Sequence, residues 1–190
     1  MLKNLKKITL IIALGLLSVN LVACGNQTNS SSTKEKVTSS KKAQSSSKKV
    51  IKKTASLTGQ KFQTPQGLFV ITENHVTASA TAGKKVLILR YTFTNSSKSQ
   101  LVPSDYWYKY LKATQTVNGK TKKLVQGSLP FSTSTTKDDS LENSSVNEVK
   151  SGKTLNAEGS WELAKNGAPV KIKFYDSHHQ LVATRQYATE

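Results

Sequence analysis

The reactive side chains of this chain are few, and their spacing restricts the chemistry they could support. Of its 190 residues only Cys24 is a cysteine, so neither an intramolecular disulfide framework nor a cysteine-rich zinc site can form. Of three histidines, His178 and His179 are adjacent, so on an extended chain they point to opposite sides and chelate a metal poorly. No Gly-x-Ser-x-Gly elbow and no common phosphate-binding glycine loop is present. We therefore expect no enzyme, no metal site and no cofactor.

Two weaker metal sites remain open alternatives. Asp138, Asp139 and Glu142 could hold a hard cation through oxygen ligands, although their spacing matches no calcium-binding loop. A site using His75 or Asp176 together with the paired histidines is the other possibility. The simpler interpretations are a solvated acidic patch and exposed histidines in a turn.

An aromatic segment is the strongest candidate for ligand binding. On a strand, Tyr106, Tyr108 and Tyr110 would share one face, with Trp107 and Lys109 on the other. Amphipathic rings stack on sugars and peptides and are enriched at interfaces. The segment therefore indicates a surface for a glycan or a peptide. The alternative is that one face supplies core while the tyrosine hydroxyls reach the surface.

Cys24 follows a segment with the order of a secretory signal. Three lysines precede the uncharged residues 8–19, which span about 18 Å as a helix against a hydrocarbon core of about 30 Å. Leu21-Val22-Ala23-Cys24 then resembles the lipobox of bacterial lipoproteins. The resemblance implies a diacylglyceryl group on the Cys24 sulfur and cleavage between Ala23 and Cys24. Residues 1–23 would then be a signal peptide, and membrane lipid a partner through the acylated Cys24.

Residues 24–60 have the composition of a disordered tether. From residue 25 to 60 there are 14 Ser or Thr, eight Lys and one acid, Glu35, too little apolar surface to offset chain entropy. The formal charge of +17 divides into +3 in the signal, +7 in the tether and +7 in residues 61–190. The tether lysines could bind anionic headgroups or wall polymers, at about 1 kcal/mol per Lys near a surface, or only keep a spacer extended. Because the remaining charge is spread thinly and the chain is exported, we expect no nucleic-acid binding.

Residues 61–190 have the alternating pattern of an all-β domain. Apolar and polar residues alternate in short segments at 67–72, 75–81, 84–95, 111–117, 122–126, 154–163, 170–175 and 180–187. Asn118-Gly119 is a strong hairpin signal. Seven to eight strands with no convincing helix predict an antiparallel β-sandwich, with 128–147 as a long loop over it.

A further resemblance involves the predicted strand at 84–95. From Gly83 onward this segment reads Gly-Lys-Lys-Val-Leu-Ile-Leu-Arg-Tyr-Thr-Phe-Thr-Asn-Ser-Ser. Together with Ser-Gly-Lys-Thr-Leu leading to Trp161-Glu162-Leu163, it resembles Ig-like domains of unknown function in Gram-positive surface lipoproteins, over about residues 60–187. The resemblance implies an Ig-like sandwich with no established activity and no catalytic residues to transfer.

The sequence thus predicts a non-enzymatic lipoprotein on the extracellular face of the bacterial cell membrane, displaying one domain. Two alternatives stay open. The domain could bind a wall glycan or a protein partner through the Tyr106–Tyr110 aromatics, or it could be a small envelope enzyme or inhibitor built on the loop at 128–147.

Overall fold

The computed structural model describes residues 53–190, so the predicted signal peptide, Cys24 and the predicted tether up to residue 52 lie outside the described residues. The strands are β1 (Ser56–Thr58), β2 (Lys61–Gln63), β3 (Gly67–Ala78), β4 (Lys85–Asn95), β5 (Leu111–Val117), β6 (Lys120–Lys123), β7 (Thr154–Glu162), β8 (Val170–Tyr175) and β9 (Leu181–Tyr187). The helices are α1 (Pro103–Tyr110) and α2 (Lys137–Ser145). Over residues 53–190, neither helix has the length and apolar character needed to cross a membrane.

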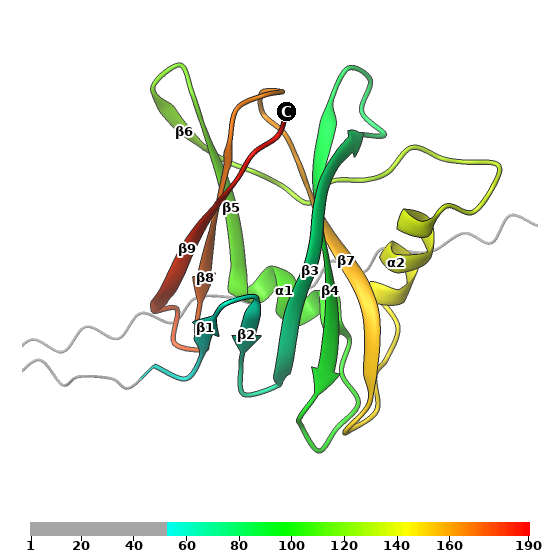
Figure 1. Cartoon of the computed structure of the whole chain (residues 1–190), viewed down its shortest axis with the longest axis vertical. Helices are drawn as coiled ribbons and strands as arrows, with labels where there is room; N and C mark the ends of the chain where they lie inside the picture. The colour runs from blue at the N-terminus through cyan, green and yellow to red at the C-terminus, as the bar shows by residue number, and fades with distance from the viewer. Residues whose placement is uncertain (1–52) are drawn as a thin grey trace, which may run out of the picture. The chain divides into compact units, whose positions relative to one another are not determined.

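The strands form two antiparallel sheets that face each other (Figure 1). The first sheet has the order β1-β2-β3-β4-β7, and the second has the order β6-β5-β8-β9. The prediction of an all-β antiparallel sandwich is therefore confirmed, with nine strands in residues 53–190. The Asn118-Gly119 hairpin also forms, because both residues adopt the positive φ that the tight turn requires.

A β-bulge explains why the chain between residues 67 and 81 was expected to form two strands. β3 is one strand of 12 residues, and its register against β4 shifts between Ile71 and Glu73. An extra residue in one strand interrupts the alternation of buried and exposed side chains. The sequence pattern therefore breaks at this point while the hydrogen-bonded ladder continues.

Both helices lie where no helix was expected. In α1, Pro103 occupies the first turn, where a missing N–H costs nothing, and the buried residues Pro103, Trp107 and Tyr110 follow a helical spacing. α2 lies inside the predicted loop 128–147. It begins with a reciprocal cap, in which the Thr136 hydroxyl accepts from the Asp139 N–H and the Asp139 carboxylate accepts from the Thr136 N–H.

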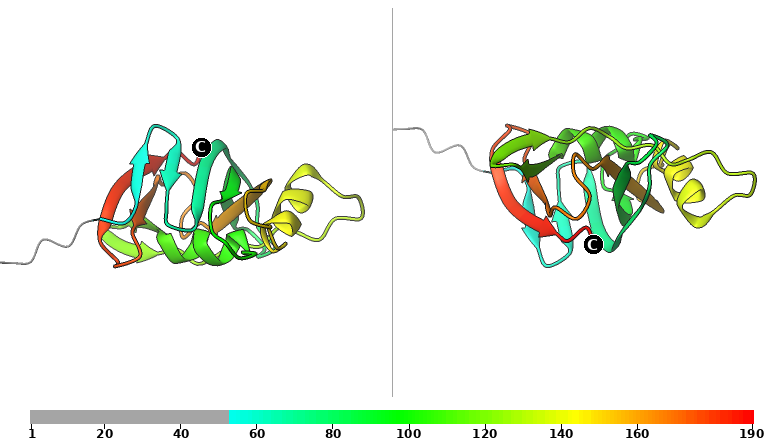
Figure 2. Two further views of the ribbon diagram at one scale, coloured as in Figure 1. Left: turned by 90° about the horizontal axis from the view of Figure 1, so that it is seen from below. Right: turned by 90° about the horizontal axis from the view of Figure 1, so that it is seen from above.

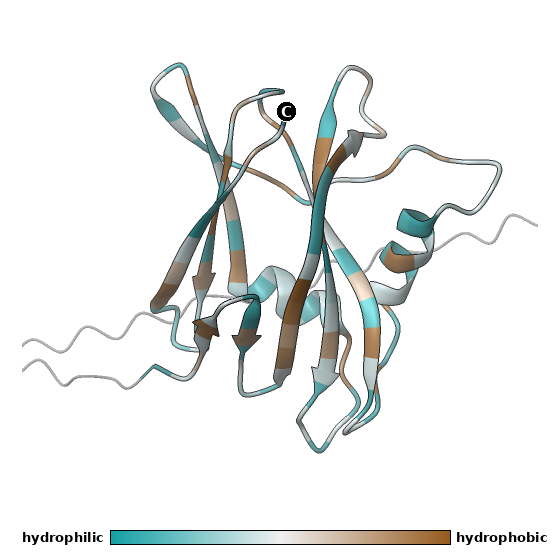
Figure 3. Ribbon diagram, in the orientation of Figure 1, coloured by the Kyte–Doolittle hydropathy of each residue, from teal (hydrophilic) through white to brown (hydrophobic). Residues whose placement is uncertain are grey.

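The core between the sheets is rich in aromatic rings, and Figure 3 shows hydrophobic stretches on the facing strands. Tyr91 and Trp107 stack with their ring centroids 4.1 Å apart, and Trp107 also lies 6.2 Å from Trp161. α1 thus closes one side of the core with the ring of Trp107.

The domain boundary was predicted at residue 61, but the folded domain begins several residues earlier. Ala55 is buried, and β1 pairs with β2 through Leu57 and Phe62. The Thr54 N–H donates to Asp176 Oδ2 at 3.1 Å, and the Thr54 and Ser177 hydroxyls are 2.6 Å apart. These contacts attach the start of the described chain to the turn between β8 and β9.

Candidate functional site

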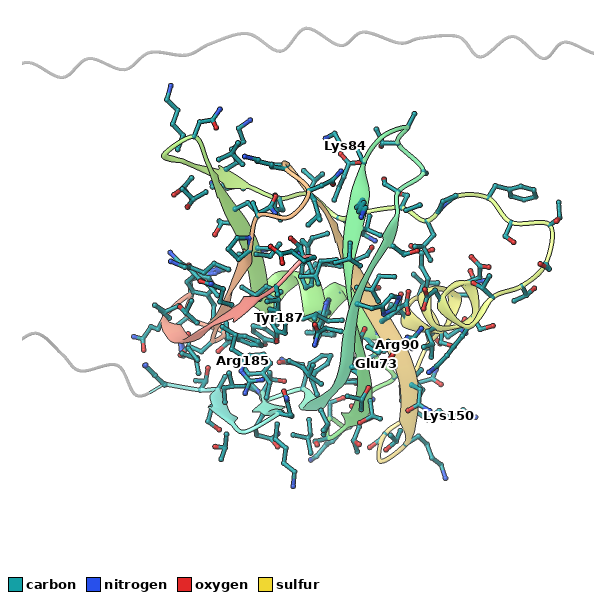
Figure 4. All side chains as sticks on the ribbon, turned by 45° about the horizontal axis from the view of Figure 1, so that its top comes forward. Glu73, Lys84, Arg90, Lys150, Arg185 and Tyr187 are labelled. Atoms are coloured by element: carbon teal, nitrogen blue, oxygen red, sulfur yellow. The ribbon has the colours of Figure 1, made fainter. Side chains whose placement is uncertain are left out.

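A cluster of charged side chains lies on the outer face of the first sheet, next to α2 (Figure 4). We call it the Arg90 cluster; it consists of Arg90 on β4, Glu73 and His75 on β3, Glu158 on β7 and Asp138 on α2. Glu73, Arg90 and Glu158 are direct partners across the three strands, so their side chains share one face. The register of the sheet therefore assembles three of the five members, and α2 adds Asp138.

One guanidinium faces three carboxylates in this cluster. Arg90 Nη1 lies 2.5 Å from Glu73 Oε2, Nη2 contacts Asp138, and Nε lies 3.6 Å from Glu158 Oε2. His75 Nε2 lies 3.0 Å from Asp138 Oδ2. The side chains of Arg90 and Glu158 are only 12% and 2% exposed, so these charges are shielded from water.

The environment separates the pKa values of the three carboxyl groups. Burial, and next the negative charge of Asp138, raise the pKa of Glu158 to about 8. Burial opposes ionisation of Asp138 as well, but hydrogen bonds from Arg90 and His75 outweigh it and lower the pKa of that carboxyl. The hydrogen bond from Arg90 lowers the pKa of Glu73. At neutral pH Glu158 therefore holds its proton beside two ionised neighbours.

The bonds that Asp138 makes to Arg90 and His75 give the Arg90 cluster a structural role. Asp138 comes from a helix inside a long connection, and its bonds to β3 and β4 hold that helix against the sheet. A pocket of about 450 Å³ lies beside the cluster, but Glu158, the member with the most perturbed pKa, is almost fully buried. The arrangement can store a proton and hold α2 in place.

Two of the three acidic residues proposed as cation ligands in α2 are engaged in other contacts. Asp138 pairs with Arg90 and His75, and Asp139 caps α2 through Thr136. Within residues 53–190, no group of three or more His, Cys, Asp or Glu side chains is arranged to hold a metal ion. Asp176 caps its turn by accepting from the N–H groups of His178 and Gln180, and His75 is bonded to Asp138. These contacts argue against both alternative cation sites.

The prediction of a ligand-binding aromatic row is wrong for Trp107 and Tyr110. Both side chains are 0% exposed, because the segment is a helix that turns them into the core. Tyr106 and Tyr108 are half-buried, and the Tyr108 hydroxyl accepts from the Ser160 N–H at 3.0 Å. The segment is therefore a packing element between the sheets.

Sequence reasoning did not identify Arg90, Glu73 and Glu158 as a group. The available signal was Arg90, which lies between apolar residues in a strand. A charge that is buried in such a strand needs a partner of opposite charge, so an acidic partner could have been expected. The identity of that partner depends on strand order and on α2, which lies 48 residues further along the chain at Asp138.

Comparison with known proteins finds one matching family model and several solved structures of similar fold. A family model described as Domain of unknown function (DUF5067) matches residues 26–176. A structure described as a candidate lipoprotein from Staphylococcus aureus superposes with a TM-score of 0.62 at 18% identity, over 73% of this chain and 94% of that chain. A protein from Enterococcus faecalis, solved by NMR, gives 0.59 at 16% identity over 72% and 94%. At such identities the likeness shows a shared fold alone. No curated protein matches the chain.

Proposed function

The chain belongs to the DUF5067 family of domains of unknown function, and from this premise we propose that it is a lipid-anchored protein of the bacterial envelope. In this proposal the diacylglyceryl group on Cys24 holds the chain at the extracellular face of a Gram-positive cell membrane. The lysine-rich tether separates the lipid from an Ig-like, non-catalytic β-sandwich, which is the displayed part. The fold shared with a candidate lipoprotein from Staphylococcus aureus supports this proposal.

The position of the first described residues carries the proposal of display. Thr54 is bonded to Asp176 and Ser177, so the chain leaves the sandwich beside the β8–β9 turn. α2 and the connection that leads to it lie at the opposite end of the sandwich (Figure 2). A tether attached at one end leaves the other end free to meet a partner.

The connection before α2 has the character of a presented element. Phe131 lies within this connection and is 95% exposed, although a large aromatic side chain is ordinarily buried. The Arg90 cluster holds the base of this connection through Asp138. A connection that is held at its base and carries an exposed aromatic side chain suits contact with another molecule, since aromatic residues anchor many interfaces.

Replacement of the lipidation residue tests the proposal. We expect full-length wild-type chain expressed in a Gram-positive host to incorporate a clickable palmitate analogue and to sediment with membranes. Cys24→Ser should abolish the label. The variant should also keep its signal peptide, so that its mass is that of the uncleaved full-length chain. The matched control is Ser30→Ala, which alters the same region and leaves the thiol intact. Equal labelling of Cys24→Ser and the wild type would exclude lipidation at Cys24.

Protease treatment of intact cells tests display separately. We expect external protease to cleave the wild-type chain while a cytosolic marker stays intact. Protection of the chain in cells whose label is normal would place the domain on the inner side and contradict display without affecting lipidation.

A further inference from the structure

The positive charge of the sandwich is concentrated in the second sheet. Residues 53–190 contain 18 Lys and Arg against ten Asp and Glu. The strands β5, β6, β8 and β9 contain seven of these bases and no acid. The rest of the described chain therefore holds 11 bases and ten acids, which nearly balance. The excess charge belongs to one sheet.

Four of these bases share the outer face of that sheet, which we call the lysine face: Lys112, Lys123, Lys171 and Lys173. They alternate with the buried residues Leu111, Ala113, Val170, Ile172 and Phe174. Lys123 and Lys171 flank Thr114 on either side, and Lys112 lies directly opposite Lys173. None of these four lysines takes part in an ion pair within residues 53–190.

Two adjoining hollows lie on this face and share Thr114 and Lys173 in their walls. The first, of about 200 Å³, is lined by hydroxyl, amide and ammonium groups from Thr114, Thr116, Thr121, Lys171, Lys173 and Gln186. The second, of about 420 Å³, adds Lys112 and Lys123 above a largely apolar wall that includes Leu124, Trp161 and Tyr175. Neighbouring strands lie about 4.8 Å apart and alternate residues about 7 Å apart, so the ammonium groups form a closely spaced array.

We infer that the lysine face is a binding site for a linear phosphodiester polymer. Like charges placed directly opposite each other destabilise a sheet. Lys112 lies opposite Lys173, and although Lys112 Nζ donates to the Tyr108 carbonyl, an anionic partner would relieve the repulsion between the two ammonium groups. Lysine binds phosphate as a point charge, without the paired donors that arginine offers to phosphate or carboxylate. This face carries lysine only, which suits the single charges spaced along a phosphodiester chain. The threonine hydroxyls supply neutral donors between the charges.

The charge also excludes two other occupants of the face. The tether contains eight lysines and one acid, so it is repelled. A second copy docked symmetrically would bring two lysine faces together. An anionic bilayer would use the charge but not the threonine hydroxyls of the first hollow, and the experiment below distinguishes it.

The inference is tested by comparing how two triple Lys→Gln variants, which have the same net charge, bind a phosphodiester oligomer. The mature chain 24–190 carrying Cys24→Ser is titrated with a short abasic phosphodiester oligomer, which has phosphates but no bases. We expect Lys123→Gln/Lys171→Gln/Lys173→Gln to weaken binding roughly tenfold at low salt and to reduce the slope of log K against log salt by about 2, since each neutralised charge contributes about 0.7.

The matched control is Lys85→Gln/Lys98→Gln/Lys153→Gln, which removes three exposed lysines outside the second sheet and leaves the tether unchanged. We expect it to change affinity by no more than about threefold. Equal loss in both variants would show that net charge alone binds, and would overturn the inference. So would tighter binding to polyglutamate, or binding to anionic vesicles but not to the oligomer.

Thermal unfolding shows whether weaker binding by the face variant results from a loss of stability. Because the three lysines point outward and one of them repels Lys112, we expect the face variant to melt at or above the wild-type temperature. A face variant that melts lower than the control would assign these lysines a structural role instead. The inference uses the proposed function only for location, so it can fail while lipidation at Cys24 holds, and the reverse.

Discussion

At the scale of single residues, Glu158 is the side chain whose chemistry departs most from its ordinary behaviour. Its carboxyl is 2% exposed, it faces Arg90 Nε at 3.6 Å, and burial with the charge of Asp138 raises its pKa to about 8. A carboxylic acid in this setting is neutral at pH 7 and can donate a hydrogen bond. It therefore relieves the repulsion that a third ionised carboxylate would create in the cluster.

The raised pKa of Glu158 predicts how stability depends on pH. The folded protein keeps a proton that the unfolded chain releases above its usual pKa of 4.5. The stabilisation is therefore complete below pH 4.5 and is lost as the pH rises toward about 8, with a slope of up to about 1.4 kcal/mol per unit. We expect the free energy of unfolding, measured in urea, to fall across this window by more in the wild type than in Glu158→Gln.

The control for this experiment is Glu148→Gln, because Glu148 is an exposed glutamate outside the Arg90 cluster. It should reproduce the wild-type dependence on pH. If Glu158→Gln and Glu148→Gln gave the same slope between pH 4.5 and 8, Glu158 would not be the group that titrates.

At the scale of elements, strands were predictable and helices were not. In β5 and β8 the alternation of buried and exposed residues spans the whole strand, so sequence gave the same limits as the structure. α1 was missed because Tyr and Trp favour strands, although Pro103, Trp107 and Tyr110 have the spacing of one helix face. α2 was missed because its contacts with the sheet are largely polar, so it has no apolar stripe to recognise.

The functional residues were predictable from sequence only where a local pattern marks them. Lipidation at Cys24 is proposed from a local motif, whereas the Arg90 cluster joins residues as far apart as His75 and Asp138, which are 63 positions apart in sequence. Such a cluster depends on strand order, on the bulge in β3 and on the position of α2. None of these is encoded by a short pattern around any one member.

The contact between α1 and β7 leads to a prediction about packing. A Cβ on Gly159 would lie 2.1 Å from Trp107 Nε1, and a strand position otherwise tolerates alanine well. We expect Gly159→Ala to lower the free energy of unfolding by about 2–3 kcal/mol, because the indole or β7 must shift in a filled core. Urea unfolding followed by tryptophan fluorescence and by far-UV circular dichroism measures the change.

A double-mutant cycle identifies the cause. Leucine at position 107 has no atom at the Nε1 position, so Gly159→Ala should cost at least about 1 kcal/mol less in a Trp107→Leu background. An equal cost in both backgrounds would mean that the substitution acts on β7 itself and not on its contact with α1.

At the scale of the whole molecule, the two sheets have different tasks. The first sheet carries the balanced Arg90 cluster and holds α2, while the second carries the seven unbalanced bases. The chain leaves the sandwich where these two sheets meet, since β1 belongs to the first sheet and Thr54 is bonded to the turn of the second. The start of the domain therefore joins its two layers.

This joining role predicts where the folding unit begins. A chain of residues 61–190, cut at the boundary expected from composition, loses the β1 pairing, the burial of Ala55 and the N–H that Thr54 donates to Asp176. We expect it to be about 3 kcal/mol less stable than residues 53–190, from lost apolar burial and lost hydrogen bonds. Thr54→Ala in the longer chain, which removes only the hydroxyl contact with Ser177, should cost about 1 kcal/mol. Equal unfolding midpoints for the two chains would show that the folding unit starts at residue 61 and that β1 adds nothing to the sandwich.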